Sequence, residues 1–172
     1  MRRLWKRLRA DAARHEGWAD PALWPLLVYR LGQAAEGLPG PVRGVASKGY
    51  GMLGLGVELV TGTRLHRETR VGAAPHFIHG RNVRIHPDAV IGDRVGIMHD
   101  VTIGTRNDIE GAPIIEDDAF IGAGAKVLGP VRVGKGAIVA ANSLVVTDVP
   151  PGATAMGVPA RALPQRKKPR PG

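Results

Sequence analysis

The sequence predicts a mainly β protein, in which six-residue repeats build a parallel β-helix with an N-terminal helical cap. Three features predict this fold: an unbroken period of six in the middle of the chain, abundant Gly with few aromatic residues, and a helical pattern near the start. The chain has 172 residues, of which 24 are Gly and 4% are aromatic. So few large rings disfavour a sandwich or a bundle with an aromatic core. The length suits one domain with a short appendage.

Residues 1–60 form the predicted helical region. Leu4, Trp5 and Leu8 recur at helical spacing between Lys and Arg residues. A second helix is expected to begin at Asp20-Pro21, as an N-cap followed by a proline at the first helical position, and to end near residues 37–40. The segment 42–60 holds five Gly, so its helical pattern is weak. A packed cap is the favoured interpretation, although basic residues with Trp also suit peripheral contact with a membrane.

Residues 61–150 form the predicted β-helix. Every sixth residue in much of this region is Ile or Val, and Gly often follows directly. A period of six fits neither an α-helix nor a strand meander, but it matches the hexapeptide β-helix, in which three units close one triangular coil. Successive coils should therefore stack about 4.8 Å apart, with these residues inside. The positions are Ile85, Ile91, Ile97, Ile103, Ile109, Ile115, Ile121, Val127, Val133, Val139 and Val145.

Two segments depart from the repeat. Residues 105–113 are expected to form a loop at one corner, with a length that keeps the repeat in phase. A loop at a single corner of a rigid scaffold favours a binding role over a tolerated insertion. Residues 151–172 form the predicted C-terminal extension and a Pro-rich basic tail, for which solubility is favoured over phosphate contact after Gln165.

Composition narrows the classes of site and partner. The chain has no Cys, which excludes a disulfide framework, a thiolate metal site and a cysteine acyl-enzyme. A net charge of +9 favours phosphorylated or polyanionic partners or a membrane surface, and no nucleic-acid partner is expected. No long apolar stretch follows the basic start, so no signal peptide or membrane span is predicted. We expect a cytoplasmic protein, possibly at the inner face of the membrane.

The histidines are the first candidates for chemistry. A zinc site would need three imidazoles from neighbouring coils, and no candidate pair has the stacking separation, so no metal site is predicted. His15 and His66 lie outside the regular coils, and we expect no catalytic part for them. Counted back from Ile85, His79 falls on an inward position, so it is either a satisfied core histidine or the mark of a cleft. The candidates are His76, His79, His86 and His99.

Residues 72–163 resemble the serine acetyltransferase group of left-handed β-helix acyltransferases. A His before Val-Thr-Ile-Gly, a short Thr-Arg-Asn loop and Tyr29-Arg30 make them more similar still to the colanic-acid-type polysaccharide O-acetyltransferases of that group. The resemblance implies a left-handed β-helix, a homotrimer, and acetyl-CoA as a co-substrate with no permanently bound cofactor. The matching strings are His79-Gly80, residues 99–104 (HDVTIG), residues 121–129 (IGAGAKVLG) and residues 157–161 (GVPAR).

The resemblance also implies the roles of individual residues. The family's catalytic base matches His79, which would deprotonate the acceptor hydroxyl as it attacks the thioester. His99 and Asp100 would bind the acceptor, although His99 could equally be a surface corner residue. CoA would lie along the β-helix, in the groove between neighbouring subunits of the trimer. The residues implied to hold it are Thr102, Gly104, Thr105, Ala123, Lys126, Ala141, Ala160 and Arg161.

Three positions depart from the serine acetyltransferase pattern. Ile78 replaces the Asp before the catalytic His, and Gly111 and Ala112 replace the Arg-His pair that grips the amino-acid carboxylate. A zwitterionic acceptor needs paired charges, because a buried unpaired carboxylate is costly. We therefore expect O-acetylation of a sugar or polysaccharide hydroxyl. The alternatives are serine O-acetylation in cysteine biosynthesis and a non-catalytic β-helix binding module.

Overall fold

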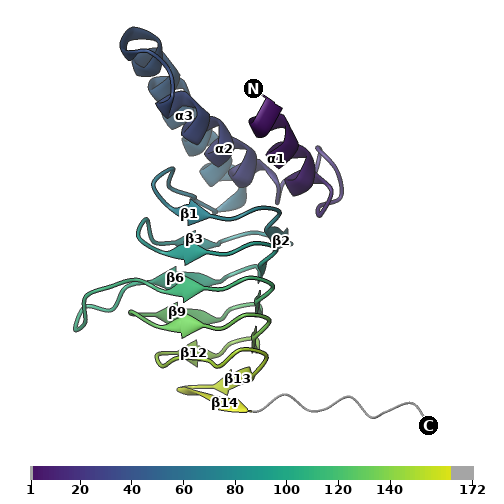
Figure 1. The fold of residues 1–172 in the computed structure, drawn as a ribbon, viewed down its shortest axis with the longest axis vertical. Helices are drawn as coiled ribbons and strands as arrows, with labels where there is room; N and C mark the ends of the chain where they lie inside the picture. Colours follow the sequence, from purple (N-terminus) through teal and green to yellow (C-terminus); the bar gives the residue numbers. More distant parts are fainter. Residues whose placement is uncertain (1, 164–172) are drawn as a thin grey trace.

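The computed structural model describes residues 2–163. Three helices lie at one end of a stack of short strands: α1 (Arg2–Ala12), α2 (Trp24–Glu36) and α3 (Gly40–Thr61) (Figure 1). The strands are β1 (Arg70–Val71), β2 (His76–Ile78), β3 (Arg84–Ile85), β4 (Val90–Ile91), β5 (Gly96–Met98), β6 (Thr102–Gly104), β7 (Ile114–Ile115), β8 (Phe120–Ile121), β9 (Lys126–Leu128), β10 (Arg132–Val133), β11 (Ile138–Val139), β12 (Leu144–Val145), β13 (Thr154–Gly157) and β14 (Ala160–Leu163).

The strands form three sheets, one on each side of a triangular coil. The first side holds β1, β4, β7 and β10, the second holds β2, β5, β8, β11, β13 and β14, and the third holds β3, β6, β9 and β12. Neighbouring strands are parallel, except that β14 turns back antiparallel to β13. The chain therefore has the predicted mainly β fold, a left-handed parallel β-helix with N-terminal helices.

The strand register confirms that the loop keeps the repeat in phase. After the loop, Phe120 pairs with Ile138, 18 residues later, which is three units of six. Across the loop, Gly96 pairs with Phe120, 24 residues later, which is four units. The loop thus adds one whole unit of six residues. It connects β6 on the third side to β7 on the first side, and so projects from a single corner.

Ile and Val fill the interior of the β-helix. Ten of the eleven predicted inward positions are at most 4% exposed. The exception is Ile109, which is 45% exposed because it lies in the loop. The inward placement predicted for Ile109 is therefore wrong. It matched the period because the loop happens to contain a complete unit of six residues.

The first coil is longer than the repeat predicts. His76 pairs with Gly96, 20 residues later rather than 18. The inward side chains around this turn are Phe77 and Val83, at 1% and 0% exposure. His79 lies between them at the corner, exposed and with a φ of +50°. The inward position that we counted back from Ile85 is therefore wrong for His79, because the first coil holds two extra residues.

The helices differ from the sequence prediction in their ends. α2 begins at Trp24, not at Asp20-Pro21, and Pro25 lies in its first turn. Asp20 instead accepts a hydrogen bond of 2.9 Å from the N–H of Ala22 in the preceding turn. α3 is a continuous helix although it contains six Gly residues. Within residues 2–163, no helix is both long and apolar enough to cross a membrane.

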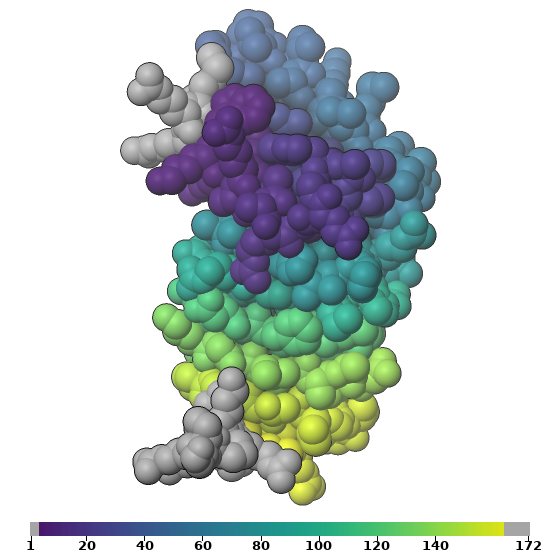
Figure 2. Space-filling view, turned by 90° about the vertical axis from the view of Figure 1, so that its right-hand side faces the viewer, coloured from purple at the N-terminus to yellow at the C-terminus, as the bar shows by residue number. Residues whose placement is uncertain are grey.

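Buried polar contacts attach the helices to the first coil. The Arg30 guanidinium forms a 3.0 Å ion pair with Asp11, and both side chains are almost fully buried. Arg30 also donates to the carbonyl oxygen of Val71 at 3.1 Å. The Tyr29 hydroxyl donates to the Thr69 carbonyl oxygen at 2.7 Å, and burial raises the pKa of this phenol. Figure 2 shows α1 and the segment after it lying over the first coils.

Candidate active site

Four of the predicted site residues lie in one row along the corner between the second and third sides. The register pairs Ile78 with Met98, and it aligns the strands of the two following coils in the same way. The residues that follow these strands therefore lie at equivalent places in successive coils. At a coil spacing of about 4.8 Å, the row is about 14 Å long. Its members, here called the His79 row, are His79, His99, Ala123 and Ala141.

The corner itself is closely hydrogen-bonded. The His99 carbonyl oxygen accepts from the Gly124 N–H at 3.0 Å, and the Ala123 carbonyl oxygen accepts from the Asn142 N–H at 2.8 Å. Asn142 has a positive φ of 56°, the left-handed conformation that lets the chain turn. The side chains at the far end of the row are two methyl groups. The row is thus a fixed edge on which Ala123 is half-buried and Ala141 is exposed.

His79 opens into a cavity at the top of this row. Its φ lies in the left-handed region, as it does at other turns of the chain such as Asp100 and Asn142. Its carbonyl oxygen accepts from the N–H of Arg81 at 2.7 Å, which tightens the turn. The cavity has a volume of about 230 Å³. Its lining comprises Asp20, Pro21, Ala22, Thr61, His79, Gly80 and Arg81.

Two charged residues of this cavity, Asp20 and Arg81, were not predicted from the sequence. Asp20 comes from the segment between α1 and α2, and its carboxylate also accepts from the Glu16 N–H at 3.3 Å. Arg81 is exposed and follows His79 in the corner turn. The sequence signal at Asp20, an Asp before Pro, indicated only a helix cap. No pattern within the repeat links it to His79, because tertiary packing alone brings the two together.

His99 and Asp100 lie one coil below His79. The Nδ1 atom of His99 is buried without a hydrogen-bond partner among the described residues. Asp100 accepts from the Asn82 side-chain amide at 3.1 Å, and its carbonyl oxygen accepts from the Lys126 ammonium at 2.7 Å. The Lys126 ammonium is therefore held by the backbone of the preceding coil. The Nδ1 atom of His99 is therefore available to hydrogen-bond a ligand, one coil below His79.

The remaining predicted residues lie on two other parts of the surface. Thr102 and Gly104 belong to β6 on the third side, and Thr105 begins the loop. Ala160 pairs with Gly157, which lies in the coil after Ala141 by the register of β11 and β13. Arg161 is exposed on β14. The structure thus places Ala160 and Arg161 beyond the C-terminal end of the His79 row.

The loop and the His79 row occupy different corners of one chain. The row runs between the second and third sides, whereas the loop leaves the corner between the third and first sides. Arg106 pairs with Asp108 inside the loop and holds the pKa of that carboxyl below its ordinary value. The row and the loop therefore lie at opposite edges of the third side.

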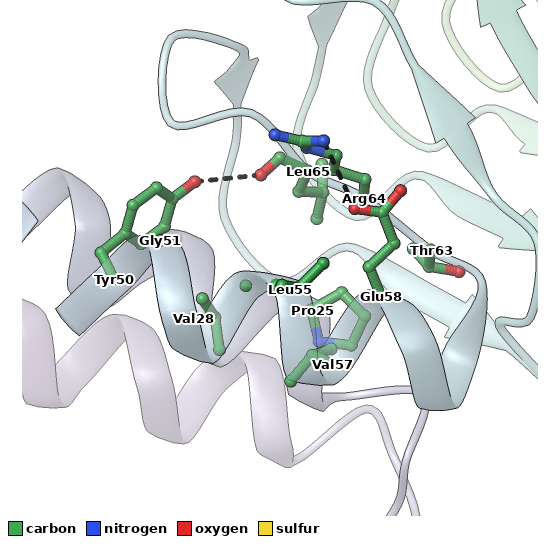
Figure 3. Close-up of a pocket in the computed structure, with 11 residues that line it drawn as sticks. Pro25, Val28, Tyr50, Gly51, Leu55, Val57, Glu58, Thr63, Arg64 and Leu65 are labelled. Atoms are coloured by element: carbon green, nitrogen blue, oxygen red, sulfur yellow. Dashed lines mark hydrogen bonds and ion pairs between the residues drawn. The ribbon is translucent and has the colours of Figure 1, made fainter. Parts of the chain in front are cut away.

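A smaller cavity lies away from the predicted site. It has a volume of about 80 Å³ and lies between α2, α3 and residues 63–65 (Figure 3). Tyr50 closes one side by donating to the Leu65 carbonyl oxygen at 3.2 Å. It contains none of the predicted site residues. Among residues 4–163, whose side chains are described, no group of three His, Asp or Glu could hold a metal ion.

Comparisons with known proteins agree on one family. Residues 112–147 match the family model described as bacterial transferase hexapeptide (six repeats). The chain is 33% identical over 162 residues to the serine acetyltransferase of Helicobacter pylori, covering 91% of both chains. It is 40% identical over 117 residues to that of Mycobacterium tuberculosis, covering 67% of this chain and 51% of the relative. The chain thus spans about half the length of several curated relatives that it matches.

Solved structures give the same result. The soybean serine acetyltransferase complexed with serine superposes with a TM-score of 0.78 at 31% identity, covering 93% of this chain and 69% of that one. The serine acetyltransferase from Brucella abortus in complex with coenzyme A has a TM-score of 0.77 at 26% identity, covering 95% and 67%.

These relatives correct the predicted acceptor. The sequence analysis favoured a sugar or polysaccharide acceptor and a closer similarity to colanic-acid-type enzymes. That prediction is wrong, because the relatives at 33–42% identity and the structural neighbours are serine acetyltransferases. The prediction rested on the uncharged residues Ile78, Gly111 and Ala112. It failed because a charge that is missing at one position can be supplied by residues elsewhere in the fold. The chain belongs to the serine acetyltransferase family of hexapeptide-repeat proteins.

Proposed function

We propose that this protein is an acetyl-CoA-dependent acyltransferase that acetylates the hydroxyl of serine. The observation that carries the proposal is the cavity beside His79, which holds one carboxylate and one guanidinium. Acetylserine is the class of product that a cysteine-forming pathway consumes, so the protein would act in cysteine biosynthesis. The solved relatives that bind serine and coenzyme A support the same two substrates.

The charges of the cavity suit a zwitterionic amino acid. Serine carries an ammonium and a carboxylate, and each needs an opposite charge once water is removed. The Asp20 carboxylate can accept from the ammonium, and the Arg81 guanidinium can bind the carboxylate through two parallel hydrogen bonds. Both residues line the same cavity as His79. They supply the paired charges that Ile78, Gly111 and Ala112 lack.

His79 is the proposed general base. It takes the proton of the serine hydroxyl while that oxygen attacks the thioester carbonyl of acetyl-CoA. Collapse of the tetrahedral intermediate breaks the carbon–sulfur bond, and the proton goes to the departing CoA thiolate. Imidazole suits this role because it titrates near neutral pH, and such catalysis typically contributes about 10²–10⁴-fold. No acyl-enzyme is needed, since the thioester is already activated.

The His79 row is the proposed track of CoA. An extended pantetheine arm needs a straight edge with small side chains, and Ala123 and Ala141 supply one. Thr102, Gly104 and Thr105 would lie near the thioester, and Ala160 and Arg161 near the nucleotide, where a guanidinium can bind phosphate. Lys126 and Asp100 would hold the corner between them. A homotrimer would bring the loop of one chain to the row of the next, since the two lie at different corners of one chain.

The decisive experiment measures CoA release from acetyl-CoA with and without L-serine, using a thiol reagent. The chain has no Cys and adds no background. We expect serine-dependent turnover in the wild type and a loss of at least about 10²-fold in His79→Ala, with CoA affinity unchanged. Lys48→Ala is the control, since Lys48 is exposed on α3, outside the row, the loop and the cavity. Wild-type turnover in His79→Ala would remove the proposed base, and turnover without serine would remove the acceptor.

A further inference from the structure

The last turn of α1 is connected to strand β2, which leads directly into His79. The Phe77 N–H donates to the Nε2 atom of His15 at 3.2 Å. The Nδ1 atom of the same ring lies 2.7 Å from the Asp11 carbonyl oxygen. β2 is the edge strand of its sheet, because β5 is its one neighbour there. His15 therefore satisfies a backbone donor that no strand partner reaches.

These two contacts define the protonation state of His15. An N–H group can only donate, so Nε2 must be the unprotonated acceptor toward Phe77. A carbonyl oxygen can only accept, so Nδ1 must carry the proton toward Asp11. Only the neutral ring meets both conditions. Protonation of Nε2 would turn an acceptor into a donor facing another donor, and the buried Phe77 N–H would lose its partner.

The neighbouring charges act in the same direction. The His76 ring meets the His15 ring edge to face at 5.1 Å between centroids. Burial lowers the pKa of His76, and His15, Arg14 and His79 lower it further, while Asp20 opposes them. The Asp11 carboxylate faces away, since it is engaged by Arg30 and by the Ala74 N–H. A proton added to His76 therefore meets positive groups and loses hydration, with only Asp20 opposing this.

We propose that His15 is a positioning residue, which in its neutral form holds β2 and thereby the His79 corner, and which releases that corner when protonated. This inference rests on the proposed role of His79. Phe77 is the second residue before His79, so a shift of β2 moves the corner turn directly. Acid would then reduce acetyl transfer twice, through protonation of His79 and through loss of its support by His15.

The experiment compares His15→Gln, whose amide oxygen can replace Nε2 as an acceptor but cannot be protonated, with His15→Leu. We expect log kcat/KM for serine acetylation to fall toward acid with a slope of about 1 in His15→Gln, and with a slope above 1 over part of the range in the wild type, for about tenfold of additional loss. His15→Leu should lower kcat about tenfold with KM for acetyl-CoA unchanged, the effect of one lost hydrogen bond. Leu8→Ala weakens α1 packing without touching Phe77, and it should keep the slope of the wild type. Equal slopes in the wild type and His15→Gln would overturn the proposal.

A second measurement separates this proposal from the proposed function. The amide-exchange protection factor of Phe77, corrected for intrinsic exchange, needs no substrate. We expect it to fall about tenfold or more between pH 8 and pH 5 in the wild type, and to stay constant in His15→Gln. A protection factor that does not depend on pH in the wild type would overturn the positioning role. Absence of serine turnover with a pH-dependent protection factor would overturn only the proposed substrate.

Discussion

Asp20 and Arg81 are charged residues whose proposed role follows from their position in the cavity of His79. Neither belongs to the repeat, and neither has a charged partner in the described chain that would neutralise it. Both line the cavity of His79. Asp20 is held by the N–H groups of Ala22 and Glu16, which orient its carboxylate before any ligand binds. Preorganised charges of this kind bind a substrate at a lower entropic cost than mobile ones.

Asp20→Asn should weaken serine binding while leaving acetyl-CoA binding intact. The amide oxygen can still accept from the Ala22 N–H, so the turn before α2 survives, but the negative charge is lost. A hydrogen bond to a charged group contributes about 1.5–3 kcal/mol, so we expect KM for serine to rise about 10–100-fold. Steady-state kinetics with each substrate varied in turn provide the measurement.

Glu16→Gln is the control for this substitution. Glu16 is an exposed acidic neighbour that lies outside the cavity, and its change removes the same charge from the same segment. We expect unaltered kinetics for it. If both variants raise KM for serine alike, the effect is one of general electrostatics, and Asp20 has no direct contact with the ammonium.

At the scale of the element, the coil differs from the loop that interrupts it. Ile121 and Ile109 occupy equivalent places in the six-residue period, but Ile121 is 0% exposed and Ile109 is 45% exposed. Ile121→Ala removes three methyl or methylene groups from a packed interior and should cost about 2–5 kcal/mol in the free energy of unfolding. Ile109→Ala should cost less than about 0.5 kcal/mol. Urea denaturation of the two variants provides the measurement.

Ile121→Ala and Ile109→Ala control for each other, because the same side-chain atoms are removed and only the burial of the site differs. Equal losses of stability would mean that Ile109 is buried and that the coil continues through residues 105–113. A small loss in Ile121→Ala would mean that the inward register is wrong.

The repeat could be predicted from the sequence because every coil has the same pattern of inward and corner residues. Inward Ile and Val, with Gly or Asn at the corners, recur at a spacing that a single strand and turn dictate. The length of the first coil could not be read in this way. Phe77 and Val83 fill the interior where the period predicts His79, and only the register with β5 shows the two additional residues.

The candidate site was predicted where it follows the repeat, and missed where it depends on tertiary packing. The His79 row follows from the stacking of coils, so its members could be named from their spacing and from a family resemblance. Asp20 and His15 reach the first coils only because α1 and the segment after it pack there, whereas Arg81 lies in the longer first coil itself. The buried Arg30–Asp11 ion pair belongs to the same junction. A pattern within one element carries no signal for contacts of this kind.

At the scale of the whole molecule, the geometry of the β-helix separates the two halves of the proposed site. The His79 row and the loop lie on different corners, with the third side between them. In the proposed closed ring of three chains, the loop corner of one chain would meet the row of its neighbour by the same contact three times. Each site would then take His79 from one chain and the loop from the next.

This arrangement predicts complementation between two inactive variants. One variant carries His79→Ala, and the other has residues 106–112 replaced by a Gly-Ser linker of equal length. Each should form a trimer without activity. In an equimolar mixture unfolded and refolded together, a site is complete when a loop variant supplies His79 and a His79→Ala chain supplies the loop. Random assembly gives that arrangement at about a quarter of the sites, so about a quarter of the wild-type activity should return.

The mixture separates a shared site from a site within one chain. If one chain supplied both elements, no complete site could form from the two variants, and the refolded mixture would stay inactive. Mixing the folded trimers without unfolding is the control, since chains that do not exchange cannot complement. Sedimentation should give a mass near three times the 18.2 kDa of one chain, before and after mixing. A trimer without complementation would keep the assembly but place both His79 and the loop of each acetylation site on a single chain.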